Sequence, residues 1–173
     1  ITPPSGWTAI RTTTDGNIGV ISAYKIATSS DVAASNFTFT SSTSAQIAGG
    51  ILRITGHSAG LPIWTSNGYT TSNTTSPSLA NTITPAIADS LIILSFANQA
   101  GTGTISNYAI VTSNPSWTEA FDLTTGSQFS IGVAYAIRTQ TTATGNASAS
   151  FTGSASSDWA GQQIAVTISR DVS

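Results

Sequence analysis

The sequence predicts an all-β protein, a jelly-roll-like antiparallel β-sandwich whose two halves form a pseudo-repeat. Three observations predict this fold. Apolar and polar residues alternate over short runs, and long helical periodicity is absent. Clusters of Gly, Asn, Asp and Thr separate the runs, as turns separate antiparallel strands. Thr and Ser together form about a third of the chain, and β-branched Thr suits the exposed face of a pleated sheet.

The expected strands follow one another along the chain. Ser90–Phe96 is the strongest, because bulky residues occupy both of its faces and indicate burial on both sides. A short helical turn is expected over residues 86–90. The other strands are expected from Trp7 and over residues 20–26, 37–40, 51–54, 131–137, 147–151 and 163–168. Turns are expected at residues 15–17, 66–68, 101–103, 124–126 and 144–146.

Similar motifs recur in the same order in the two halves of the chain. Trp-Thr, a Tyr followed by Ile two residues later, a Phe-Thr pair and Ala-Gly appear twice. Trp7 and Trp117 are 110 residues apart, Tyr24 and Tyr135 are 111 apart, and the Ala-Gly pairs are 112 apart. Small loop insertions produce such drift, whereas chance similarity among Thr-rich strands is the alternative. We therefore expect one β-sandwich over residues 1–173, with half-repeats at about 1–62 and 79–173 joined by a polar loop over 63–78.

The first half lacks one element of the second. The strand at residues 89–96 precedes Trp117, and no counterpart precedes Trp7 in this chain. A missing strand leaves an open sheet edge, and open edges recruit partners. The sequence therefore predicts an N-terminus that is truncated or completed by a neighbouring chain.

The run from Pro4-Ser5-Gly6-Trp7-Thr8 through Ala23–Thr28, Phe37–Phe39, Ala48–Ile51, Gly56 and Pro62-Ile63 resembles a known family. It is similar to a jelly-roll module of phage virion and tail proteins and of large secreted bacterial surface proteins. The resemblance continues through Ala88–Ile92 and Trp117-Thr118. It implies a β-sandwich accessory or surface module, without known catalytic residues.

Composition excludes several classes of function. A net charge of −2, with only five Lys and Arg, is not the basic footprint of a nucleic-acid-binding protein. Without Cys, the chain has no disulfides and no thiolate metal site. Its apolar runs are too short to span a bilayer as a helix. Lys25 and Arg138 follow the repeated Tyr residues, and we expect them to end strands in solvent.

Candidate catalytic residues are few, and we predict that the chain is not an enzyme. His57 is the only histidine, and no Gly-x-Ser-x-Gly motif positions a nucleophile, so His57 is expected in a loop. Glu119 and Asp122 are the closest pair of carboxylates, but strict alternation places them on opposite faces of a strand. No metal site or other cofactor is expected, since Asp15-Gly16-Asn17 is only a turn signal and no Asp-x-Asp-x-Asp run exists. A single calcium ion bound in a loop stays an alternative.

Exposed aromatic residues suggest a glycan-binding surface. Trp64 and Tyr69 flank the polar stretch that contains Asn67, outside the repeated motifs. Sugars stack on aromatic faces and hydrogen-bond to neighbouring amides, so Trp64, Tyr69 and Asn67 are the candidate ligand-binding residues. Packing within the loop is the alternative role for both aromatic residues. Trp7, Trp117 and Trp159 are expected in the core.

A surface of Thr, Ser, Asn and Gly has few ionic groups and few flexible Lys side chains, which suits repetitive packing between copies. The sequence therefore predicts a non-enzymatic structural component of a virion or extracellular assembly, such as a phage tail, fibre or capsid-surface protein. Its expected partners are other copies of itself or neighbouring virion or surface proteins. The alternative is a carbohydrate-binding or adhesive module of a larger secreted protein, with cell-surface glycans as partners.

Overall fold

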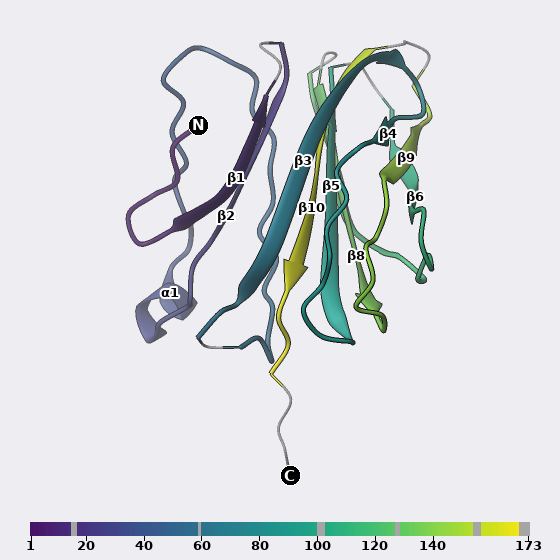
Figure 1. Ribbon diagram of the computed structural model, residues 1–173. Coiled ribbons are helices and arrows are strands. Elements are labelled where there is room, and N and C mark those ends of the chain that lie inside the picture. The colour runs from purple at the N-terminus through teal and green to yellow at the C-terminus, as the bar shows by residue number, and fades with distance from the viewer. Residues whose placement is uncertain (15–16, 59, 100–102, 127–128, 154–156, 170–173) are drawn as a thin grey trace.

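The computed structural model describes residues 1–14, 17–58, 60–99, 103–126, 129–153 and 157–169. It confirms the predicted all-β class, with antiparallel sheets packed in layers (Figure 1). The elements in chain order are β1 (Thr8–Thr14), β2 (Gly19–Tyr24), α1 (Ser29–Ala33), β3 (Ile63–Thr74), β4 (Ser78–Leu79), β5 (Ser90–Asn98), β6 (Ile105–Ile110), β7 (Thr118–Thr125), β8 (Phe129–Arg138), β9 (Ala147–Phe151) and β10 (Ser157–Val166). The jelly-roll connectivity and the pseudo-repeat stay predictions.

Five strands form the central sheet, in the order β3-β10-β5-β8-β7. β5 lies in its middle, so that Ile93 stands between Ile164 of β10 and Tyr135 of β8. Leu94 belongs to the apolar cluster on one face of the sheet, and Ile93 belongs to the cluster on the other face. Because both faces are covered, β5 is apolar on both sides, as its sequence predicts.

A three-stranded sheet, β4-β9-β6, covers one face of the central sheet. The largest apolar cluster lies between these two sheets. Trp159 is fully buried there and makes edge-to-face contacts with Phe96 and Phe151, at centroid distances of 6.3 and 5.9 Å. Leu79 is also fully buried and lies against Gly161, where a Cβ would overlap its Cδ1 atom. The two sheets therefore approach closely along β10.

The opposite face of the central sheet is covered by the N-terminal layer, which consists of β1, β2 and residues 37–57. β1 lies against β3, where a Cβ on Gly68 would overlap the Thr13 hydroxyl. Gln162 of β10 is fully buried and connects the central sheet to this layer. Its Nε2 donates to Val20 O at 2.9 Å, and its Oε1 accepts from Ser22 Oγ.

The hairpins β1-β2 and β7-β8 pair in matching registers. Thr8 lies opposite Tyr24, and Thr118 lies opposite Tyr135. Both first strands carry an irregularity at the same place, two residues beyond that Thr. The two segments that the sequence analysis aligned therefore form the same local structure.

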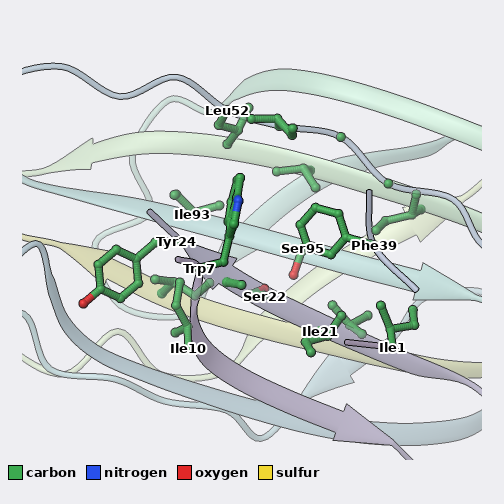
Figure 2. A pocket seen from close by; sticks show the side chains of 18 of the residues that line it. Ile1, Trp7, Ile10, Ile21, Ser22, Tyr24, Phe39, Leu52, Ile93 and Ser95 are labelled. Carbon is green, nitrogen blue, oxygen red and sulfur yellow. The ribbon is translucent and has the colours of Figure 1, made fainter. Parts of the chain in front are cut away.

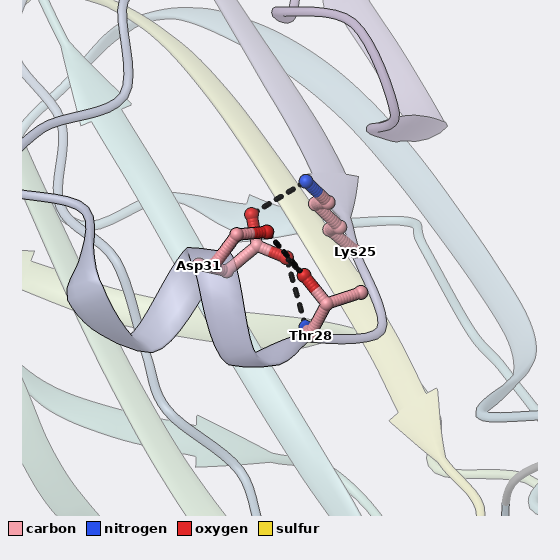
Figure 3. A network of polar contacts seen from close by, with 4 residues as sticks. Lys25, Thr28 and Asp31 are labelled. Carbon is pink, nitrogen blue, oxygen red and sulfur yellow. Dashed lines mark hydrogen bonds and ion pairs between the residues drawn. The ribbon is translucent and has the colours of Figure 1, made fainter.

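The helix α1 was not expected from the sequence. The Asp31 carboxylate accepts hydrogen bonds from the Thr28 N–H at 2.8 Å and the Thr28 hydroxyl at 2.7 Å, and it pairs with Lys25 (Figure 3). The hydrogen bond from Lys25, followed by those from Thr28, lowers the pKa of Asp31 to about 2. The signal was the Thr28-Ser-Ser-Asp31 spacing, which is typical of a helix N-terminus. The helical turn expected at residues 86–90 is a bend and turn instead.

Three other expectations differ from the structure. The prediction of a polar loop over residues 63–78, with a turn at 66–68, is wrong. Residues 63–74 form β3, which pairs with β10. Residues 37–40 and 51–54 are not strands, because no strand pairs with them in the described part of the chain. Their one β-bridge there joins Thr40 to Thr2. Part of the turns expected at 15–17 and 101–103 lies outside the described residues.

Candidate functional site

A large cavity lies between the N-terminal layer and the central sheet, and we call it the N-terminal cavity. Its volume is about 1750 Å³. Figure 2 shows Trp7, which immediately precedes β1, pointing into this space. The residues of the central sheet that form its floor are Ile63 of β3, Ile93 and Ser95 of β5, Phe121 of β7, Phe129, Ile131 and Val133 of β8, and Ile164 and Val166 of β10. The cavity is therefore an apolar space inside the sandwich.

An aromatic cluster also lines the cavity. Trp7 makes edge-to-face contacts with Phe37 and Phe39, at centroid distances of 5.3 and 5.4 Å. The sequence analysis placed Trp7 in the core, but the structure places it beside the cavity. The cluster therefore gives the side opposite Ile93 an apolar surface as well.

Two buried polar atoms at the cavity have no hydrogen-bond partner among the described residues. They are Trp7 Nε1, a donor, and Ser95 Oγ, a donor and acceptor. Ser95 is only 6% exposed. A buried polar group without a partner costs about 1–3 kcal/mol, so both atoms lower the stability of this part of the fold.

The cavity is bordered by two extended segments that lack a strand partner on that side. One consists of β2 and the following residues to 27, and the other comprises residues 45–55. Among the described strands, β2 pairs only with β1. No backbone hydrogen bond joins residues 45–55 to another segment within the described ranges. Both borders therefore present backbone groups that an added strand can pair with.

The candidate glycan-binding residues lie on a strand rather than in a loop. Trp64 and Tyr69 of β3 are 48% and 46% exposed. They are five positions apart along the strand, about 16 Å, so they do not clamp a single sugar ring. Asn67 is committed internally, since its Nδ2 donates to Thr82 O at 3.0 Å and its Oδ1 accepts from the Gly68 N–H at 2.8 Å.

The expectation that Glu119 and Asp122 lie on opposite faces of a strand is wrong. They lie opposite Ala134 and Gly132, which share one face of β8, so both carboxylates lie on the same face of β7. The bulge at Ala120 adds one residue and resets the alternation.

Asp122 has a structural role. Its Oδ2 accepts the Ile105 N–H at 2.7 Å. Burial raises its pKa, and the hydrogen bond from Ile105 opposes that rise. Burial also raises the pKa of Tyr108, with smaller contributions from the charges of Glu119 and Asp122. The structure therefore ties Asp122 to β6.

The remaining polar candidates also have structural contacts. His57 forms a bridge with Ile168, and its Nδ1 lies 3.2 Å from Ser58 O. The expectation that Arg138 lies in solvent is wrong. Arg138 is 1% exposed and donates to the backbone carbonyls of residues 112, 140, 142 and 143. Burial lowers its pKa.

Metal-binding side chains do not form a group of three or more within the described ranges. Asp15 and Gly16 of the turn predicted at residues 15–17 lie outside those ranges. The described residues also contain no helix that is long and apolar enough to cross a membrane.

Comparisons with known proteins identify no relative. No protein-family model matches the chain. No curated protein and no solved structure matches it significantly. The resemblance to phage and surface modules therefore stays a prediction.

Proposed function

We propose that this chain is a non-enzymatic structural module of a virion or extracellular assembly, and that it acts by self-association and attachment. The observation that carries the proposal is the outer edge of β3. This strand is twelve residues long, ends the central sheet and contains no charged residue. Arg11 of β1 covers one part of this edge, because it donates to Ser66 O at 2.8 Å. Natural proteins usually protect such edges with charges, proline or short strands, so the rest of this long edge favours pairing with a second copy.

The side chains of β3 support the same function. Trp64 and Tyr69 place large apolar surfaces beside the edge, where each is about half exposed. Only 7% of the chain is charged, so repulsion between copies is weak. Together these features favour repeated contacts between identical modules.

The test is the assembly state in solution, measured by light scattering with electron microscopy of the same sample. We expect the purified chain to form assemblies, and we expect Trp64→Lys combined with Tyr69→Lys to shift them to monomers. The matched control is Val111→Lys, because Val111 is 74% exposed and lies outside the strands. A wild-type chain that stays monomeric at every concentration would contradict the proposal.

Glycan binding is the second candidate function, and the exposure of Trp64 and Tyr69 is the observation that favours it. Replacing both residues with Ala, without added charge, removes the stacking surfaces. Saturable binding of the wild type to an immobilised polysaccharide, lost in this double variant, supports the glycan function. Equal binding by both proteins excludes these residues as the glycan surface.

A further inference from the structure

We propose that the N-terminal cavity binds an uncharged β-strand from outside these 173 residues, apolar on both faces as β5 is. The strand inserts between β2 and residues 45–55. This surface is separate from the β3 edge, and the inference does not depend on self-association through that edge.

The two hairpins β1-β2 and β7-β8 correspond to each other. β1-β2 and β7-β8 share their register and the position of their irregularity. In the second half, β8 has a further neighbour, because β5 pairs with it along nine residues. β5 also pairs with β10, so it joins β8 to β10 in one sheet.

The spacing of the repeat relates β8 and β10 to two segments of the first half. Subtracting 111 from the β8 residues 132–138 gives residues 21–27, and subtracting 112 from the β10 residues 157–166 gives residues 45–54. These are the two segments that border the N-terminal cavity. The cavity therefore occupies the place in the first half that corresponds to β5 in the second.

The cavity is large enough to hold a strand. A strand rises about 3.3 Å per residue, with spacings of about 4.8 Å between strands and 10 Å between sheets. Nine residues, the length of β5, then fill about 1400 Å³. The cavity, at about 1750 Å³, accommodates such a strand.

The chemistry of the cavity walls sets the chemistry of the strand. Toward the central sheet, the strand meets Ile93, Ile131 and Val133, and the opposite wall includes the aromatic rings of Trp7 and Phe39. Both of its faces must therefore be apolar, as those of β5 are. Its backbone polar atoms have partners in the backbone groups of the two bordering segments.

A second copy of the described chain does not provide this strand. Its own β5 is paired on both sides in the middle of the central sheet, and withdrawing it would dismantle both main apolar clusters. A small apolar molecule would fill the volume without pairing the backbone groups along β2 and residues 45–55.

The test uses a synthetic peptide with the sequence of residues 88–99, followed by a solubilising tail of lysines. We expect saturable one-to-one binding in calorimetry and slower amide hydrogen exchange in residues 19–27 and 45–55. The matched control peptide carries Pro at the position of Ile93, which removes a ladder donor, and we expect its binding to be at least tenfold weaker.

Two further proteins locate the binding. In Ser95→Trp the indole fills the cavity, and we expect loss of peptide binding with an unchanged circular dichroism spectrum. If Ser95→Trp does not fold, a fusion of residues 88–99 to the N-terminus through a flexible linker replaces it. In the fusion we expect a higher melting temperature and protection of residues 45–55.

Several results would overturn the inference. The first is equal binding of both peptides. The second is unchanged amide exchange at residues 45–55 with both the peptide and the fusion. The third is slower exchange that depends only on the concentration of the chain, which indicates that a second copy binds. Displacement of a fluorescent apolar dye without backbone protection points to a small-molecule site and also overturns it. Trp64→Lys with Tyr69→Lys leaves the cavity intact, so failure of assembly through β3 is distinguishable from failure of strand binding.

Discussion

Replacing Gln162 with Leu tests how the N-terminal layer is held on the central sheet. Gln162 and Gln163 are adjacent in β10, fully buried, and directed to opposite faces. Gln162 bonds to Val20 O and Ser22 Oγ in the N-terminal layer. Gln163 donates to Asn81 Oδ1 and Gly145 O, both at 2.9 Å, on the side of the three-stranded sheet. Gln163→Leu is therefore a matched control in the same strand.

The magnitude follows from the bonds that are lost. The two shortest hydrogen bonds contribute about 1 kcal/mol each, and the longer ones from Nε2 to Thr13 Oγ1 and Arg11 O contribute less. Leaving Val20 O without this donor adds about 1–2 kcal/mol. Leu is close to Gln in size, so the cavity term is small. We expect Gln162→Leu to lower the free energy of unfolding by about 2–4 kcal/mol. For a chain of this length, that corresponds to a fall in melting temperature of about 5–15 °C.

Hydrogen exchange measured by mass spectrometry identifies the affected layer. We expect Gln162→Leu to speed exchange in residues 8–14 and 19–24, while residues 78–83 and 144–149 stay protected. Gln163→Leu should show the reverse pattern. Equal stability of Gln162→Leu and the wild type, or faster exchange on the side of the three-stranded sheet alone, would refute the reasoning.

The remaining predictions concern acidity and packing. Because the pKa of Asp31 is lowered to about 2, its stabilising contribution is present above its usual pKa of 3.8 and is lost as the pH falls toward 2. Urea unfolding of Asp31→Asn should therefore depend less on pH between 4 and 2, and an unchanged dependence contradicts this. The raised pKa of Asp122 has the opposite sign, because the folded state favours its protonated form and stability is lost as the pH rises above 3.8. Asp122→Asn should match or exceed the wild type in stability at pH 7 if its amide oxygen still accepts the Ile105 N–H, and a large loss argues that the charge itself is needed. Leu79→Ala should cost about 2–5 kcal/mol in thermal unfolding. Gly161→Ala should be destabilising alone and less so in the Leu79→Ala background, whereas additive losses exclude their contact as the cause.

The candidate sites show the limits of sequence reasoning at single residues. Alternation placed Glu119 and Asp122 on opposite faces, and one bulge reversed that assignment. Charge placed Arg138 in solvent, but four backbone carbonyls surround it in the interior. Neither a bulge nor a set of converging carbonyls leaves a signal in a single sequence. Trp64 and Tyr69 are about half exposed, and their role as a glycan surface stays a prediction.

The sequence by itself determined the all-β class and the central strand β5, because period-two alternation and an apolar run on both faces are local signals. It also aligned the two hairpins, whose matching registers the structure shows. Only the tertiary structure decided that residues 63–74 form a strand and that residues 45–55 do not. A segment becomes a strand when a neighbouring segment pairs with it. β3 lies beside β10, whereas residues 45–55 border a cavity and have no strand partner among the described residues. The physical reason is that backbone hydrogen bonds in a sheet join segments distant in the chain, so local residue patterns do not specify which segments find a neighbour.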